Sequence, residues 1–500
     1  MTDVVPATDA KVPLPANDED ANLEQFGYTQ KLDRSVGRLA SFAIGFATIS
    51  ATTAVFTGFG AGYFTAGAPF VWTLLLAAAV FLIWVVIAAD LTAKIPLAGY
   101  AYQWTSRIHG SILAWFTGVM ALAGWICGMT GVGFILSGYL GGLFGWGMSQ
   151  TVQILVAIGV MAVCMLVNLY GVRFATMVNN IGVSLEFVIT IGATILVAIV
   201  AFSAPENHQS FSVLFTGGTS EGSNPYILAW LAASLGPFFG LIGVEASADV
   251  AEETVNARTV IPRTMFYALT ASIVIEFGMY VVYVLAIKDV DAVAANSAAP
   301  IEEIITQQVG PVITKIVIAV ALTNVMACIL ANILVATRLT YSMARDNMLP
   351  FSHVWRHVSP SNRTPTYAVL GLFGFSTALL LLALVSEQAF FLILGLSALA
   401  VFATYVLQTV ALIIGHRRGT IPAAEPGTFD LGRARMPIYV VGLIVFSLVC
   451  AALILLPQFA GNKWVFLGLV VLAGIWAATG LRGRLSRGEA GPDFAKTHLS

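Results

Sequence analysis

Two apolar segments of the chain carry residue types that suit an opened helix and the binding of a small polar solute. The first is TISATTA, residues 48–54, in the middle of a hydrophobic run over 39–66. Clustered small, hydroxyl-bearing and β-branched residues disfavour a continuous helix, and Ser and Thr hydroxyls replace backbone hydrogen bonds where a helix opens. Bared backbone groups persist in lipid only where they line a cavity or hold a ligand. A straight helix packed through Gly58 and Gly62 is the alternative.

The second segment is LGPFFGLIGVE, residues 235–245. Pro237 removes a backbone donor, and the glycines on both sides of it weaken the helix further. Glu245 is costly near a membrane interior unless it is paired or faces water. A proline kink packed against neighbouring helices is the alternative to a break that serves a function.

If both helices open, the two breaks offer opposite poles. Amides freed near Thr52, Thr53 and Ala54 would receive a carboxylate or another polar head, helped by the positive end of a half-helix. Carbonyls over residues 239–242 would receive an ammonium group, and the ring of Phe239 is large enough to cover a bound solute or stack on a cation. A zwitterion or an amine fits this pair of poles.

The composition places these segments in a membrane protein. The 500 residues are 58% hydrophobic and only 10% charged, whereas soluble domains carry about 25% charged residues. A net charge of −2 excludes a nucleic-acid binder held by bulk positive charge. The four cysteines have no CxxC spacing, and the six histidines form no group inside an apolar run, so the sequence predicts no metal site, no cofactor and no enzyme active site.

Hydropathy predicts twelve membrane-spanning helices. Their expected ranges are 39–66, 70–94, 111–141, 150–171, 178–202, 226–248, 264–287, 309–337, 366–386, 389–415, 437–457 and 463–481. With the N-terminus inside, all of the 24 Lys and Arg residues fall on inner segments except Lys288, Lys315 and Lys463. We therefore expect a multi-pass protein of the plasma or inner membrane with both termini in the cytoplasm.

The positions of the two suspected breaks divide the chain. They fall in the first and sixth predicted helices, and interrupted helices at matching places in two halves are typical of an inverted-repeat transporter. The expected organisation is a disordered cytoplasmic tail (1–36), a first repeat of five helices (37–203), a second repeat (204–415), helices eleven and twelve (416–482) and a C-terminal cytoplasmic tail (483–500).

Several motifs, taken in order along the chain, resemble the amino acid–polyamine–organocation superfamily of permeases, in particular its amino acid/choline branch, which includes aminobutyrate permeases. TTAVF at 52–56 stands where the superfamily usually has GSGIF. IPLAGYAYQW at 95–104 looks like the segment between the second and third helices, and GVEASADVAEET at 243–254 is similar to the sixth-helix signature. Residues 338–350 and 426–433 match the loops after the eighth and tenth helices, and 338–346 also have the spacing of a short amphipathic helix.

The resemblance implies an all-α, twelve-helix fold with a five-plus-five inverted repeat, in which helices one and six are broken at mid-membrane. By this analogy the residues at the first break contact the substrate head, Phe239 is an aromatic gate, and Gly240, Leu241 and Ile242 supply carbonyls to the amine. The signature residues are Gly243, Glu245, Glu252 and Glu253.

Glu186 is the expected coupling residue. It lies in the fifth apolar run, where some members of the superfamily carry a lysine, and a carboxylate inside a membrane is a functional candidate by default. It would carry a proton or sit near a coupling cation, with sodium as the other possibility. A structural pair with Asn168 or Asn324 is the alternative.

These features predict a secondary transporter that imports an amino acid or a related amine by alternating access, coupled to protons. A proton-independent exchanger is the alternative, and a channel or a substrate sensor on the same fold fits less well. A channel requires a continuous polar path, whereas the apolar runs contain only isolated polar residues.

Overall fold

The computed structural model describes residues 23–494, apart from 147–148, 217, 219–224, 298, 385–386, 457–458 and 460. Within these residues the fold is all-α, as predicted, and no β-strand is formed. Residues 1–22 of the segment expected to be disordered lie outside the described residues. Residues 23–36 of the same segment pack against the helices, because Leu23, Tyr28, Leu32 and Val36 are all buried.

Ten helical segments of the described residues are long and apolar enough to cross a membrane. They are Arg38–Ala66, Ala68–Lys94, Ser111–Phe144, Gln150–Leu169, Val172–Ala201, Ala257–Leu285, Pro300–Arg345, Gly395–Arg418, Gly432–Leu455 and Asn462–Ser486. Two shorter apolar helices, Tyr226–Gly240 and Thr366–Leu382, lie where the sixth and ninth spans were predicted.

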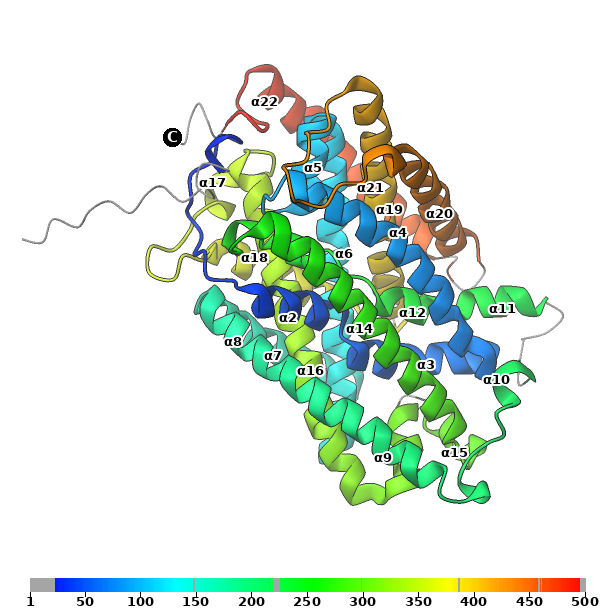
Figure 1. The fold of residues 1–500 in the computed structure, drawn as a ribbon. Helices are drawn as coiled ribbons and strands as arrows, with labels where there is room; N and C mark the ends of the chain where they lie inside the picture. The colour runs from blue at the N-terminus through cyan, green and yellow to red at the C-terminus, as the bar shows by residue number, and fades with distance from the viewer. Residues whose placement is uncertain are drawn as a thin grey trace, which may run out of the picture.

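Figure 1 shows these helices in one bundle. The labelled helices are α2 (Arg38–Ile49), α3 (Ala51–Ala66), α4 (Thr73–Lys94), α5 (Tyr100–Ile108), α6 (Ser111–Phe144), α7 (Gln150–Leu169), α8 (Val172–Leu185), α9 (Ile191–Ala201), α10 (Val213–Thr216), α11 (Tyr226–Ala233), α12 (Leu235–Gly240), α14 (Ala257–Leu285), α15 (Val290–Ala295), α16 (Pro300–Arg345), α17 (Ser352–Trp355), α18 (Thr366–Leu382), α19 (Glu387–Arg418), α20 (Arg435–Leu455), α21 (Asn462–Trp476) and α22 (Arg482–Ser486). A further short helix, α13 (Ala246–Asp249), carries no label. Helix α6 packs against α16 and α19, and α14 packs along α2 and α4. Helices α5, α17 and α22 lie at one end of the bundle, and α15 lies at the other.

The first predicted span is broken, and the break is at Ser50. This residue has φ 44° and ψ 94°, and it separates α2 from α3. The break therefore lies before the predicted Thr52–Ala54 segment, whose residues are already helical. The Ser50 side chain explains the position, because it accepts a hydrogen bond from the Thr53 amide (3.2 Å) and so caps the new helix.

The sixth predicted span is interrupted where the sequence suggested. Helix α12 ends at Gly240, residues 241–245 form turns, and a single helical turn, α13, follows. Gly243 adopts φ 111°, and a Cβ there would lie 2.5 Å from Cγ2 of Thr48, so the glycine is needed for both backbone conformation and space. Pro237 stays within α12 instead of ending it.

Residues 338–346, predicted to be a short amphipathic helix at the surface, are instead almost entirely the end of the long helix α16. Arg338 donates two hydrogen bonds to the Glu253 carboxylate (2.8 and 2.9 Å). Arg345 does the same with Glu252 (2.9 and 2.8 Å). The helical spacing predicted for Arg338 and Arg345 is confirmed. Their charges are not at the surface, however, but form buried ion pairs that connect α16 to the segment after α13.

Candidate functional site

The two breaks border one buried cavity. Its lining comes from α2, α3, α6, α12, the turn after α12, α16 and α19, namely Thr48, Ile49, Thr53, Ala54, Gly124, Trp125, Gly128, Val132, Phe239, Gly240, Ile242, Cys328, Asn332 and Ser397. The space open to the centres of water-sized molecules is about 20 Å³. A single water needs roughly 10–15 Å³ on this measure. The cavity therefore has room for little more than one water, and this narrow arrangement of the broken helices is called the closed conformation below.

The cavity contains most of the solute-contacting residues predicted from the sequence. Thr53 and Ala54 line it from α3, and Phe239, Gly240 and Ile242 line it from the second break. Two predicted residues are not part of the lining. Thr52 points the other way, with its hydroxyl 2.9 Å from the hydroxyl of Thr190, and Leu241 is fully buried in the core.

The backbone at the second break has unused hydrogen-bonding groups. In the described part of the chain, the carbonyls of Leu241 and Ile242 accept no hydrogen bond, and the amides of Gly243 and Val244 donate none. Such groups are rarely left unpaired in a protein interior, because each costs free energy comparable to a lost hydrogen bond. Of these residues Ile242 lines the cavity, so the second break can supply its carbonyl to a bound solute as an acceptor.

The first break is better satisfied than the sequence suggested. The amide of Thr52 donates to a carboxylate oxygen of Glu186 (3.0 Å), and the amide of Thr53 donates to the Ser50 hydroxyl (3.2 Å). The amide of Ala54 donates to the Ser50 carbonyl (2.9 Å), so it is not one of the freed groups. In this closed conformation the start of α3 is occupied by the protein's own side chains.

The side chains that line the cavity carry no charge. Trp125 is buried, and its indole N–H has no hydrogen-bond partner in the described part of the chain. Asn332 and Ser397 add polar groups, while Phe239 is half-buried beside them. A charged solute in this cavity would therefore be held by backbone dipoles and neutral hydrogen bonds instead of by an ion pair with a lining residue.

Glu186 lies directly behind the first break. It begins a single π-helical turn, Glu186–Thr190, between α8 and α9, and it is almost fully buried. Besides the Thr52 amide it accepts a hydrogen bond from the Ser50 hydroxyl (3.4 Å). π-Helical turns of this kind occur frequently at functional sites.

The alternative partners suggested for Glu186 make other contacts. Asn324 donates to the Thr190 hydroxyl (3.3 Å), and Asn168 donates to the carbonyls of Cys164 (3.1 Å) and Leu330 (3.3 Å). Glu186 therefore contacts the broken helix itself, and not the asparagines.

The signature residues lie outside the cavity lining. Glu245 accepts hydrogen bonds from Trp84 (3.1 Å), Tyr100 (3.4 Å) and Tyr405 (2.8 Å), so it is buried with three donors. Together with the ion pairs of Glu252 and Glu253, these bonds fix the chain after the second break to the rest of the bundle.

One buried carboxyl group near the site was not among the residues predicted from the sequence. Glu276 lies on α14, is fully buried, and has no hydrogen-bond partner for either oxygen in the described part of the chain. The signal was present in the sequence, because Glu276 falls inside the seventh apolar run.

Comparison with known proteins identifies the family to which the chain belongs. Residues 36–476 match the protein family described as amino acid permease. The chain is 24% identical over 492 residues to a putative polyamine transporter from Candida albicans, covering 92% of this chain and 86% of the relative. It is 23% identical over 443 residues to the amino-acid permease BAT1 from Arabidopsis thaliana, covering 83% and 84%. It is 24% identical over 329 residues to the serine/threonine exchanger SteT from Bacillus subtilis, covering 64% and 70%.

An all-helical bundle with many apolar, membrane-length helices and a buried cavity between two interrupted helices defines a membrane transport protein. The chain belongs to the amino acid permease family. The resemblance noted from the motifs is confirmed, and the protein is a transporter and not an enzyme.

Proposed function

We propose that the protein imports an amino acid or a related amine across the cell membrane as a secondary active transporter, by alternating access and with proton coupling. One observation carries the proposal. Among the described residues, the second break leaves the backbone carbonyl of Ile242, a lining residue, unpaired at the same cavity that the start of α3 borders. An unpaired carbonyl suits the ammonium end of a small solute, and the positive end of α3 suits its anionic or polar end.

The residues that line the cavity and the known relatives of the chain also support this substrate class. The uncharged lining suits a zwitterion or an amine whose charges are met by helix-end dipoles and carbonyls. The relatives named above are a polyamine transporter, an amino-acid permease and a serine/threonine exchanger. Within this range the chemistry common to the solutes is an ammonium group.

Alternating access requires that the cavity open to each side in turn, and the two sides are held by different contacts. On one side, the backbones of Gly58 and Gly236 meet directly. On the other, the ion pairs of Arg338 and Arg345 fix the chain that follows the second break. We propose that the first contact is the outer gate and that the ion pairs belong to the inner gate.

For the membrane arrangement we propose twelve spans, in which the shorter helices Tyr226–Gly240 and Thr366–Leu382 are the sixth and ninth. Residues 37–203 and 204–415 would then form the two inverted repeats, with residues 416–482 outside them. The distribution of Lys and Arg supports a cytoplasmic position for both termini.

Glu186 is the proposed coupling residue. It accepts the Thr52 amide at the positive end of α3, so a movement of α3 changes the environment of the carboxylate. Binding of a proton to Glu186 and the position of the half-helix are therefore linked, and each biases the other. A sodium-coupled cycle is the variant that the experiment below separates.

The test is uptake by the purified protein in liposomes. The probes are labelled serine, γ-aminobutyrate and spermidine, with a proton gradient, a sodium gradient or no gradient imposed. We expect saturable uptake of at least one probe that rises with the proton gradient. Uptake driven by sodium alone would assign a different coupling ion, and flux that does not saturate would indicate a channel.

The exchanger is the second candidate, favoured by the likeness to SteT. Liposomes preloaded with the same unlabelled solute distinguish it. An exchanger takes up label only into preloaded liposomes, whereas the proposed importer also accumulates label in empty liposomes when a proton gradient is imposed.

A further inference from the structure

Glu276 is a second buried carboxyl group, near the point where the two broken helices are in contact. It takes no part in the transport cycle proposed above. Its side chain is fully buried, and both oxygens lack hydrogen-bond partners in the part of the chain that the structure describes. An ionised carboxylate in such surroundings is strongly disfavoured, because nothing replaces the water that it loses. These surroundings favour the neutral, protonated form of Glu276 over the carboxylate.

The position of Glu276 along α14 places it opposite the first break. Ser272, Glu276 and Tyr280 follow one another at intervals of four residues and so form a stripe along one side of the helix. About two turns before this stripe the Thr264 hydroxyl is 3.0 Å from the hydroxyl of Ser41 on α2. At the far end of the stripe the Tyr280 hydroxyl donates to the Ala54 carbonyl on α3 (3.4 Å).

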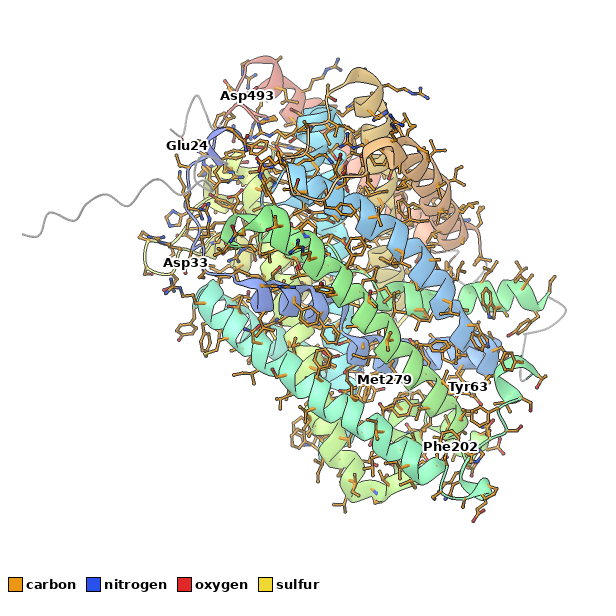
Figure 2. All side chains as sticks on the ribbon, viewed as in Figure 1. Glu24, Asp33, Tyr63, Phe202, Met279 and Asp493 are labelled. Carbon is orange, nitrogen blue, oxygen red and sulfur yellow. The ribbon has the colours of Figure 1, made fainter. Side chains whose placement is uncertain are left out.

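Between these two contacts the polar groups are unused. The hydroxyl of Ser272, like the carboxyl of Glu276, has no partner among the described residues. The chain that faces them turns at Ser50 from α2 into α3. Figure 2 labels Met279, three residues beyond Glu276, on α14 toward the end of the bundle that carries Tyr63.

Glu276 also lies directly behind the contact that closes the cavity. A Cβ placed on Gly240 would lie 2.5 Å from Cβ of Ala54 and 3.2 Å from Oε2 of Glu276. Both Gly240 and Ala54 line the cavity. Separation of α3 from α12 at this point would therefore open a path between the carboxyl group and the water that enters the cavity.

We propose that Glu276 is a proton-binding residue of the transport cycle, which holds its proton while α3 and α12 are in contact and exchanges it with water in the cavity when they separate. This inference rests on the proposed transport function. It adds a second proton site to Glu186, on the opposite side of the broken first helix and linked to the contact between the half-helices.

A proton fits this site better than a metal cation. Hard cations take several oxygen ligands held in place around them. The oxygens of Glu276 have no polar partner within hydrogen-bonding distance among the described residues, whereas a proton requires only one carboxyl oxygen.

Other charged groups do not account for the state of Glu276. Among the described residues, no charged side chain of the elements that pack against α14 forms a hydrogen bond or an ion pair with Glu276. On its own helix the nearest titratable group is Tyr280, which already donates to Ala54. The charged residues of these elements are Arg38, Asp90, Lys94, Glu186, Asp249, Glu252, Glu253, Glu302, Glu303, Lys315, Arg338 and Arg345.

The first experiment detects the proton directly, without a transported solute. Infrared difference spectra of the full-length protein in lipid are recorded over a pH series, and the carbonyl band of protonated carboxyl groups is followed. We expect one component of this band at neutral pH to be lost in Glu276→Gln and retained in Glu186→Gln. Ser272→Ala, the matched control on the same side of α14, should keep that component, because the Ser272 hydroxyl is not bonded to Glu276. An identical band in the wild type and Glu276→Gln would overturn the proposal.

The second experiment links the proton to transport. With a probe that the wild type takes up, Glu276→Gln should lose both the proton influx that accompanies uptake and accumulation driven by a pH gradient. It should keep exchange of labelled for unlabelled solute, because exchange needs no net proton movement. Unchanged proton influx in Glu276→Gln would contradict the inference. If that variant does not fold, Glu276→Met, which is similar in volume and uncharged, takes its place.

The two experiments separate the failure of this inference from the failure of the proposed function. A wild type that takes up none of the three probes would count against the substrate class of the proposed function, while the infrared band still decides whether Glu276 binds a proton. A wild type that transports with protons, combined with a Glu276→Gln variant that does the same, would overturn the inference alone.

Discussion

The contact between Gly58 and Gly236 allows a direct test of the proposed outer gate. A Cβ on Gly236 would lie 2.9 Å from the Gly58 carbonyl oxygen and 3.0 Å from its Cα, inside the 3.4 Å at which ordinary contact begins. The atoms in the way belong to the backbone, so no side-chain movement relieves the clash. In Gly236→Ala, α3 and α12 must therefore separate.

The size of the effect follows from the cost of overpacking. One added methyl group in a tightly packed contact costs about 1–3 kcal/mol. This cost falls on the closed conformation, because the two backbones are apart when the gate is open. A shift of this size changes the ratio of closed to open conformations by about 5- to 150-fold. Since each cycle passes through the closed conformation, we expect the uptake rate to fall by a similar factor.

The assay is the initial rate of solute uptake in liposomes, with solute binding followed separately by thermal stabilisation. Gly236→Ala should bind solute and insert normally while its uptake rate falls. The control is Gly278→Ala on α14, where an added Cβ meets nothing within 4 Å. There alanine should be neutral or slightly stabilising, because it favours the helix. An uptake rate for Gly236→Ala within about twofold of the wild type would refute the proposed closure.

Three further predictions concern the cavity, the coupling residue and the ion pairs. Thr53→Trp should fill the cavity and abolish uptake with membrane insertion intact, and unchanged uptake kinetics would remove Thr53 from the solute site. Glu186→Gln should flatten the pH dependence of uptake, so an unaltered pH profile would exclude this residue from coupling. Arg338→Met leaves Glu253 buried without its partner and should destabilise the protein by about 3–5 kcal/mol in thermal or denaturant unfolding. Arg173→Met, at an exposed ion pair, should lower the free energy of unfolding by less than about 1 kcal/mol. Equal losses of stability in the Arg338 and Arg173 variants would contradict the burial assigned to the Arg338 ion pair.

The second break was predictable from its residues, whereas the first was misplaced by a few positions. Proline and three glycines within residues 235–245 leave few alternatives to an interruption. The first segment contains four hydroxyl residues in a row of small ones, and any of them can stabilise an open turn. Ser50 is the site because its side chain reaches the Thr53 amide, a contact that depends on the local fold and not on composition.

The partners of the charged residues could not be derived from the sequence. Glu186 was correctly singled out as a carboxylate inside an apolar run, but its partner, the Thr52 amide, is brought to it only by the packing of α8 and α9 around the first break. Glu276 satisfies the same sequence criterion and was overlooked, because no motif surrounds it. The helical spacing of Arg338 and Arg345 suits an exposed face and a buried ion pair equally well.

A native cysteine offers the most direct test of the claim that a solute occupies the cavity between the two broken helices. Cys328 lines this cavity, and its thiol is free. The rate at which a small membrane-permeant maleimide modifies Cys328 is measured by mass spectrometry, once while a transported solute is taken up and once in its absence. The half-buried Cys450 on α20 serves as the internal control. We predict that the solute slows modification of Cys328 and leaves Cys450 unchanged, whereas equal rates at Cys328 with and without a transported solute would contradict the account.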